Sequence, residues 1–285
     1  MDLAQLLYPN NQYTPEQLEA RYPERQLPDG AKVTRFAPSP TGFVHFGGLL
    51  PTRISERLAH QSGGVFILRI EDTDQKRKVE GAEENLLETY NYFGIRFDEG
   101  VPIDAAAGDY GPYRQSARRE IYAAFAKKLV EEGKAYPCFC TEEELTDIRT
   151  RQEREGVDPG YYGKWAVWRD ATVEQVKAKL DEGVPFVIRF KSEGDPEHKM
   201  KFTDLVKGDV EVTENHIDHV LLKSDGIPTY HFAHAVDDHL MRVTHVVRGE
   251  EWLPSLPFHI QLFKALGFKL PKYLHCSQLM KMVLA

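Results

Sequence analysis

The chain has 285 residues and carries 36 Lys or Arg against 44 Asp or Glu, so its formal net charge is −8. With 41% hydrophobic and 28% charged residues, its composition is typical of a folded globular protein and excludes a disordered, collagen-like or disulfide-scaffold chain. The sequence has no uncharged apolar run of the roughly 20 residues that a membrane helix needs, and no secretory signal at its start. We therefore expect a cytoplasmic monomer with no membrane contact and with one large or two smaller domains.

The first 30 residues are interpreted as an N-terminal extension. Thr14, Pro15 and Gln17 predict the start of a short helix that ends near Pro23, because they supply a capping hydroxyl, a proline at the first helical position and a capping-box amide. We expect the ordered core to begin after Gly30.

The next segments predict a βαβ unit. Residues 32–36 alternate like a strand, and the proline-rich run 37–42 ends that strand. Residues 47–61 are predicted to be helical. The continuous apolar run 65–70 is typical of a strand that is buried on both faces of a parallel sheet.

Two further helices are predicted after this unit, and then the pattern changes. The helices are expected over 82–93 and 117–132. Between 136 and 207 the elements are mixed: a short strand with two cysteines, a helix capped by Thr141 and Glu144, and another capped by Thr172 and Gln175. Core strands are predicted again at 220–222, 229–232 and 244–247, followed by a helix over 255–266.

This order of elements predicts an α/β fold. We expect a Rossmann-type parallel-sheet nucleotide-binding domain that is split into residues 31–135 and 208–285. A mixed α+β module over 136–207 is inserted between the two parts, and residues 1–30 precede them.

A first candidate site lies at the start of the helix predicted over 47–61. The run from Arg35 to Gly42 leads to His45, Gly47 and Gly48. Glycines at a helix N-terminus let backbone N–H groups approach a phosphate, and the helix end favours the anion. A proline-rich turn with a surface histidine would share the short His-x-Gly-Gly pattern, so that pattern alone leaves both interpretations open.

A second group of candidates follows the strand over 65–70. Glu71 and Asp74 lie at its carboxyl end, where open α/β sheets place ligand-binding groups. Carboxylates there can receive an ammonium group or can cap the following helix, and taken alone they favour neither. A ligand with a second carboxylate requires a cation to pair with it, and Arg35 and Arg248 are the candidates.

The combination of these motifs resembles the class I glutamyl-tRNA synthetases, over about residues 32–280. The matching runs are Arg35-Phe36-Ala37-Pro38-Ser39-Pro40-Thr41-Gly42, the His45-Phe46-Gly47-Gly48 form of the HIGH motif, and residues 69–74, 222–231, 236–239 and 247–252. The resemblance implies ATP-dependent ligation of L-glutamate to tRNA(Glu) through a glutamyl-adenylate, with Mg²⁺ accompanying ATP. Glutaminyl enzymes differ, because they have Pro-Pro-Glu-Pro where this chain has residues 37–40.

The resemblance also implies roles for single residues. It assigns catalysis to His45, Gly47 and Gly48. It assigns glutamate binding to Arg35, Ala37, Ser39, Glu71, Tyr230, His234 and Arg248, with a weaker supporting role for Asp74. It assigns ATP binding to His45, Gly47, Gly48, Glu251 and Leu279. His234 departs from the pattern, because some family members have an asparagine there.

We expect no metal site in the protein itself. Consecutive residues such as 237–239 seldom converge on one ion, and structural or supporting roles are expected for them. Cys138 and Cys140 match half of a zinc motif that some glutamyl enzymes carry. However, Trp165 and Val167 stand where the other two ligands would lie, and neither can bind zinc. Two buried thiols packed among aromatic side chains are therefore predicted.

The end of the sequence departs from the family. Lys281-Met282 begins a KMSKS-type loop, but residues 283–285 supply neither its serine nor its second lysine, and the anticodon-binding domain is absent from these residues. We expect impaired activity, because losing one comparable donor costs about 10²–10³ in rate. Two alternatives stay open: a glutamyl-queuosine tRNA(Asp) synthetase, and a catalytically silent fragment that binds glutamate, ATP or the tRNA acceptor end.

Overall fold

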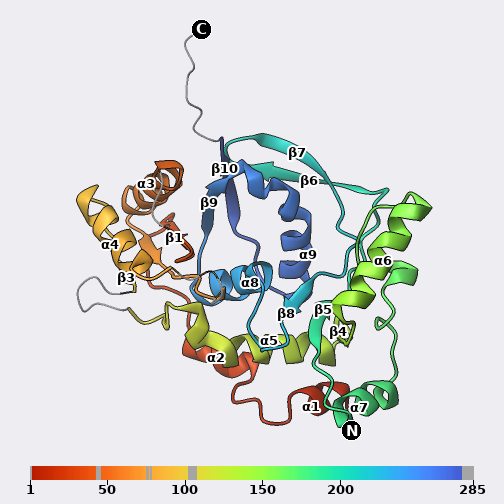
Figure 1. The fold of residues 1–285 in the computed structure, drawn as a ribbon. Coiled ribbons are helices and arrows are strands. Elements are labelled where there is room, and N and C mark those ends of the chain that lie inside the picture. The colour runs from red at the N-terminus through yellow and green to blue at the C-terminus, as the bar shows by residue number, and fades with distance from the viewer. Residues whose placement is uncertain (1, 43–45, 75–76, 78, 102–107, 278–285) are drawn as a thin grey trace.

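A computed structural model describes residues 2–42, 46–74, 77, 79–101 and 108–277. It confirms the predicted α/β class, because parallel strands form its centre and helices pack against them (Figure 1). The parallel strands are β1 (Val33–Phe36), β2 (Val65–Leu68), β3 (Glu99–Gly100), β9 (His245–Gly249) and β10 (Lys272–Cys276).

The parallel strands form two groups that meet at β1 and β9. The first group has the order β1-β2-β3, and the second pairs β9 with β10. At the junction, the N–H of Thr244 donates to the carbonyl of Val33 at 2.9 Å. The chain therefore runs from β1 to β2 and β3 on one side and returns to β9 and β10 on the other, which makes the β1–β9 boundary the point where the strand order reverses.

Helices cover these strands, as the βαβ pattern predicts. Helix α3 (Phe46–His60) contacts β1, β2 and β9. The helices α5 (Arg119–Glu131), α8 (Tyr230–Leu240) and α9 (Leu256–Leu266) pack against one another, and α4 (Ala82–Tyr92) follows β2. The core between them is apolar: Phe66, Phe125 and Phe232 are at most 1% exposed. Two 3-10 helices, η2 (Gln115–Arg118) and η4 (Glu250–Ser255), lead into α5 and α9.

The expectation that the ordered core begins after Gly30 is wrong. Helix α1 (Leu3–Leu7) and helix α2 (Pro15–Arg21) both contact α5, and Ala4, Leu18 and Tyr22 are buried in the main core. The predicted capping box of Thr14 and Gln17 is present. Sequence reasoning found the helix but missed its docking, because the apolar side chains that make the contact are spread along the segment and their partners lie far away in the sequence.

The segment predicted as an inserted module forms mixed elements, at the right and along the top of Figure 1. Its elements are β4 (Ala135–Cys138), α6 (Glu142–Glu155), η3 (Gly163–Trp165), α7 (Val173–Asp181), β5 (Val187–Phe190) and the antiparallel hairpin of β6 (Lys199–Asp204) and β7 (Gly208–Thr213). Both predicted capping boxes are present. The predicted end of the module, between residues 207 and 208, falls at the turn of this hairpin. Strand β8 (Val220–Leu222) lies beyond that limit and pairs with β5, which lies inside it. The limits of the module therefore stay a prediction.

The strand predicted over 229–232 is wrong. Thr229 has an extended backbone and occupies the N-cap position of α8, and the helix begins at Tyr230. The short apolar run there belongs to a helical pattern in which Phe232, Val236 and Leu240 recur every four residues and are fully buried. Strand β10 was not predicted.

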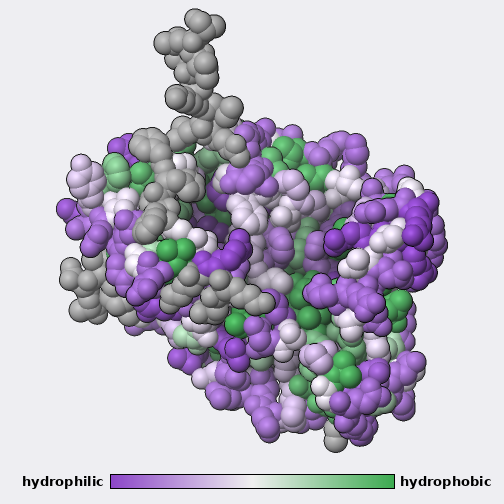
Figure 2. All heavy atoms as spheres, in the orientation of Figure 1, coloured by the Kyte–Doolittle hydropathy of each residue, from purple (hydrophilic) through white to green (hydrophobic). Residues whose placement is uncertain are grey.

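The surface shown in Figure 2 is mostly hydrophilic, with hydrophobic side chains in small separate groups. Among the described residues, none of the helices has the length and apolar character needed to cross a membrane.

Candidate active site

A cleft of about 770 Å³ opens at the carboxyl ends of β1 and β9. This is the point where the strand order reverses, and open α/β sheets bind ligands there because the flanking loops separate. The lining includes Arg35, Phe36, Ala37, Ser39, Thr41, Gly47, Gly48, Glu71, Asp74, Arg77, Lys223, Tyr230, Arg248, Gly249, Glu251, Trp252 and Ser277. Most of the residues that the sequence singled out therefore come together in one place.

One wall of the cleft is the N-terminus of α3. Gly47 and Gly48 lie in its first turn and line the cleft, and a Cβ added at Gly48 would meet nothing within 4 Å. A helix end of this kind has unpaired N–H groups and a partial positive charge, so it favours an anion such as phosphate. His45, the third residue predicted here, lies outside the described residues, as does Leu279.

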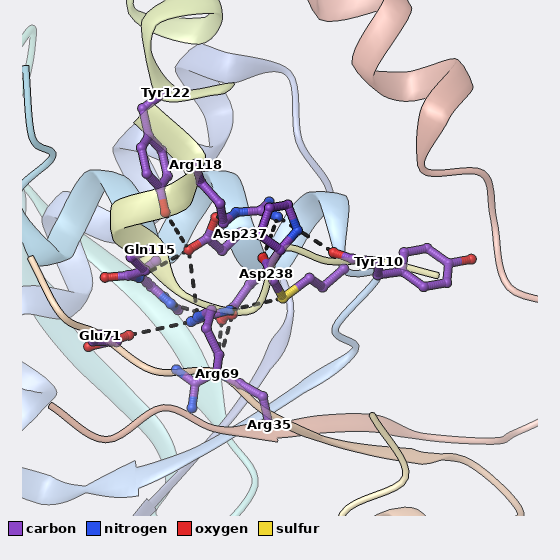
Figure 3. A network of polar contacts seen from close by, with 12 residues as sticks. Arg35, Arg69, Glu71, Tyr110, Gln115, Arg118, Tyr122, Asp237 and Asp238 are labelled. Atoms are coloured by element: carbon purple, nitrogen blue, oxygen red, sulfur yellow. Dashed lines mark hydrogen bonds and ion pairs between the residues drawn. The ribbon is translucent and has the colours of Figure 1, made fainter. Parts of the chain in front are cut away.

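Behind the cleft, two carboxylates of α8 bind several cationic and polar side chains (Figure 3). Asp238 accepts from Arg35 Nε at 3.1 Å and from Arg69 Nη1 at 2.7 Å. Asp237 accepts from Arg118 Nε at 2.6 Å. It also accepts from Gln115 and from the hydroxyl of Tyr122. The supporting role predicted for residues 237 and 238 is therefore confirmed.

The charges in this network set the protonation of its acids. Burial raises the pKa of Asp238, but the adjacent Arg35 and Arg69 outweigh burial and lower it well below its ordinary value. Glu71 is different: burial raises its pKa to about 7, although Arg69 and Arg35 act in the opposite direction. Its carboxylate lies 3.5 Å from Arg69 Nη2 and lines the cleft. A cationic ligand group next to Glu71 would relieve this cost of ionisation.

Arg35 is held by one edge only. Its Nε binds Asp238, and within the described part of the chain its two Nη atoms make no hydrogen bond. Arg35 is 4% exposed and lines the cleft from β1. The outer part of the guanidinium is therefore available to a carboxylate.

Arg248, at the end of β9, is held by two histidines. Its Nε donates to His275 Nε2 at 2.9 Å, and its Nη1 donates to His259 Nδ1 at 3.1 Å. Its guanidinium also lies 4.7 Å from the ring centre of Tyr273. The buried Nη2 has no hydrogen-bond partner among the described residues. A buried donor on a cation that lines a cleft is the group that an anionic ligand requires.

Aromatic and acidic side chains complete the rim. The rings of Tyr230 and Trp252 lie 4.3 Å apart, and burial raises the pKa of Tyr230, which keeps its hydroxyl protonated. The Glu251 carboxylate folds against Gly249 so closely that a Cβ at Gly249 would collide with it. A side chain at position 249 would therefore displace the Glu251 carboxylate from this position.

His234 and Asp74 occupy positions that differ from the others. His234 is fully buried behind the cleft and is not among its lining residues, with its Nε2 2.9 Å from the hydroxyl of Tyr273 and its Nδ1 2.8 Å from Asp238. Direct contact between His234 and a ligand is therefore not supported by its position. Asp74 does line the cleft, but it binds Arg77 Nε at 2.5 Å.

Sequence reasoning missed two cations in the cleft. Lys223 lines the cleft and donates to the Thr73 carbonyl at 3.0 Å, and Arg77 reaches it from the segment after β2. Lys223 lies inside the matching run 222–231, and Arg77 lies just after the run 69–74. Their closeness to these motifs was the signal that could have identified them.

The cysteine pair packs against aromatic rings, as predicted. The sulfurs of Cys138 and Cys140 each lie 3.4 Å from the hydroxyl of Tyr161, and Trp165 belongs to the same buried cluster. Cys140 is only half-buried, which corrects the expectation of two buried thiols. Val167 is 61% exposed. Among the described residues, no three His, Cys, Asp or Glu side chains are grouped so that they could hold a metal ion.

The fold and the cleft define an α/β protein with a cleft at the strand-order switch, lined by a helix N-terminus and by two buried arginines. Residues 32–283 match the family model described as tRNA synthetases class I (E and Q), catalytic domain. The chain belongs to this family.

Individual relatives agree with the family match. The chain is 57% identical to a glutamate–tRNA ligase of Acetivibrio thermocellus over 280 residues, which are 98% of this chain and 51% of the relative. A glutamate–tRNA ligase of Clostridium beijerinckii is 54% identical, with the same coverage. The solved glutamate–tRNA synthetase of Elizabethkingia anophelis superposes with a TM-score of 0.80 at 41% identity, over 88% of this chain and 51% of that one. The chain thus spans about half the length of the relatives that it matches.

Proposed function

We propose that this chain carries the catalytic site of an ATP-dependent ligase that joins L-glutamate to tRNA(Glu). The observation that supports this most directly is the pair of buried arginines at one cleft, Arg35 and Arg248, each with guanidinium nitrogens that have no partner in the described part of the chain. Two cations with unpartnered nitrogens, together with Glu71 in the lining of the same cleft, match an amino acid that has two carboxylates and one ammonium group. The names of the relatives agree with this substrate.

In the proposed complex, each charged group of glutamate has a partner. Arg248 binds the side-chain carboxylate, and Arg35 and Tyr230 contact the ligand from β1 and α8. Glu71 receives the ammonium group, whose charge stabilises the ionised form of this carboxyl. Ala37 and Ser39 form the wall next to Arg35. These contacts place the α-carboxylate of glutamate for attack on a nucleotide at the neighbouring helix end.

ATP is proposed to bind along α3 and the rim. The N–H groups at Gly47 and Gly48 face the phosphates, and Glu251 contacts the nucleoside part; His45 and Leu279 are assigned to ATP by the family resemblance alone. A carboxylate oxygen of glutamate attacks the α-phosphorus of ATP and pyrophosphate leaves, after which a ribose hydroxyl of the tRNA end attacks the acyl carbon and AMP leaves. Preorganised donors that stabilise the growing phosphate charge supply much of the acceleration.

Mg²⁺ is proposed to arrive with ATP. An ion that accompanies ATP is bound mainly by the phosphates and water and by at most one or two carboxylates. The ion supplies neutralisation of phosphate charge when it is bound.

The tRNA acceptor end is the proposed macromolecular partner, and the module over 136–207 is the proposed surface for it. The module lies beside the cleft domain and carries its own small core, so it can present a surface without altering the parallel strands. A cytoplasmic location follows from this partner.

Calorimetry with glutamate and glutamine tests the amino-acid assignment. We expect glutamate to bind more tightly by several kcal/mol, because glutamine would leave the Arg248 charge unpaired in a desolvated site. Equal affinity for the two amino acids would exclude Arg248 and Arg35 from these roles.

Pyrophosphate exchange and tRNA charging test the reaction. Glutamate-dependent exchange in the presence of tRNA(Glu), followed by glutamate transfer to that tRNA, is expected. Transfer to tRNA(Asp) alone would indicate the glutamyl-queuosine reaction, and binding without exchange would indicate a silent fragment.

A further inference from the structure

We propose that His259 and His275 are positioning residues for Arg248: two uncharged acceptors that fix its guanidinium while leaving its positive charge uncompensated for an anionic ligand group. This inference rests on the proposed function and deepens it, because it names the residues that make the site select glutamate over glutamine.

The hydrogen bonds of Arg248 define the protonation state of both histidines. A guanidinium has only donors. The two ring nitrogens that face it, His275 Nε2 at 2.9 Å and His259 Nδ1 at 3.1 Å, must therefore be acceptors without a proton. Both imidazoles are neutral in this arrangement, since a charged imidazole has a proton on each nitrogen.

The second nitrogen of each ring is fixed in turn. His275 Nδ1 lies 2.7 Å from the Asp204 carboxylate, so it carries the proton and donates it to this acceptor. His259 Nε2 lies 2.8 Å from His231 Nδ1 and donates to it. A carboxylate or a neighbouring acceptor that sets the tautomer in this way also fixes the orientation of the ring. Asp204 on β6 and His231 on α8 thus hold the two acceptors, which lie on β10 and α9.

The buried surroundings of His259 and His275 favour the neutral form of both rings. His259 and His275 are fully buried. Burial lowers the pKa of both, and the charge of Arg248 lowers them further, whereas Asp204 acts in the opposite direction on His275. The other titratable groups around Arg248 are the rings of Tyr230 and Tyr273, buried His234 and rim residue Glu251.

Arg248 differs from other buried arginines in how its charge is compensated. Arg69 and Arg118 bind carboxylates directly, and their charges are compensated within the fold. Arg248 has no salt bridge to an acidic side chain of the described residues, and the Asp204 carboxylate reaches it only through His275. A carboxylate next to Arg248 would compete with the ligand, whereas an imidazole holds the guanidinium and leaves the full charge for the ligand.

A matched pair of substitutions at His259 tests this inference. His259→Gln keeps a neutral acceptor toward Arg248 and an amide donor toward His231, whereas His259→Glu has the same shape and puts a carboxylate against Arg248. Calorimetry measures the affinities of both variants for glutamate and glutamine. The ratio of the two affinities is the readout, because general loosening of the fold weakens both ligands alike.

We expect His259→Gln to keep most of the preference for glutamate. In His259→Glu the preference is expected to fall by about 100-fold, because like charges placed together in a buried site repel strongly. His245→Glu is the control, since His245 lies at the far end of the same strand and contacts Thr244.

Two results would overturn the inference while leaving the proposed function intact: an unchanged glutamate preference in His259→Glu, or an equal loss in a folded His259→Gln. Absence of any preference in the unmodified protein would instead overturn the proposed function, and this inference with it. Long-range nitrogen–proton NMR of the unmodified protein gives a test that needs no variant. A protonated Nδ1 on His259 or a protonated Nε2 on His275 at neutral pH would contradict the assignment.

Discussion

Arg35 and Arg248 lie at the carboxyl ends of neighbouring strands and line the same cleft, but they are held in opposite ways. A carboxylate, Asp238, binds Arg35, and it also binds Arg69. Neutral imidazoles bind Arg248. The difference teaches that two buried arginines in the lining of one cleft can differ in whether an acidic side chain of the fold compensates their charge. Neither the residue type nor its burial separates the two cases.

The largest effect on stability is expected from removing the carboxylate that binds Arg35. Asp238→Asn removes the charge that pairs with Arg35 and Arg69, and leaving such cations buried costs about 3–5 kcal/mol of the free energy of unfolding. Urea unfolding measures this change. Asp170→Asn is the control, because Asp170 pairs with Lys191 at the surface and an exposed pair contributes less than about 1 kcal/mol. Equal effects of the two changes would contradict the structural role of Asp238.

The two arginines themselves provide the next comparison. Arg35→Leu breaks a buried ion pair and is expected to cost about 3–5 kcal/mol of stability. Arg248→Leu leaves two imidazole acceptors without a donor and is expected to cost about 1–3 kcal/mol. Urea unfolding of both variants in the absence of ligand measures the difference. A larger loss for Arg248→Leu would show that its charge is compensated within the fold after all.

A third prediction concerns pH and Glu71. Its pKa is raised to about 7 by burial, so the carboxyl takes up a proton as the pH falls through this value. Because the proposed ammonium contact needs the carboxylate, glutamate affinity is expected to be highest above pH 7 and to fall about tenfold per pH unit below it. The sign for stability is the reverse: the folded protein binds the proton more tightly than the unfolded chain, so the ligand-free protein gains stability as the pH falls from about 7 toward 4.5.

Calorimetry across pH 5.5–8.5 measures this affinity profile. In Glu71→Gln the dependence is expected to flatten and the affinity to be low throughout. A profile that Glu71→Gln leaves intact would assign the titration to another group.

The smallest effect is expected at the cysteine pair, where the prediction is no change at all. Trp165 and Val167 cannot complete a zinc site, so a chelator is expected to leave the unfolding curve unaltered. Elemental analysis of protein purified without added metal is the direct check. About one zinc per chain would mean that other side chains bind the ion.

Local sequence rules predicted much of the fold. The capping boxes at Thr14, Thr141 and Thr172 were all found from their spacing, because a cap depends on residues within one turn. The strand predicted at 229–232 was wrong for the same reason: four residues do not distinguish a strand from the first turn of a helix. The docking of Leu18 and Tyr22 depends on partners far along the chain, and no local rule reports those.

The sequence predicted which residues line the cleft, but it did not predict the contacts that hold them in place. Motif resemblance selected Arg35, Glu71, Tyr230 and Arg248, and all four line the cleft. What holds them was not predicted, because Asp238, His259 and His275 act through tertiary contacts that join different strands and helices. The neutral state inferred for the two histidines depends on their tertiary hydrogen bonds and on their burial.

The docking of the N-terminal helices has a consequence for the order in which the protein folds. Arg25 binds Glu99 across 74 positions of sequence, and Arg242 binds Glu19 across 223. During synthesis, residues 19–25 are made long before Arg242, their partner in one of these contacts. Closing such long loops is entropically costly and slows folding. Residues 19–25 therefore complete their packing only after residue 242 has been made, so a segment that is synthesised early reaches its final place late.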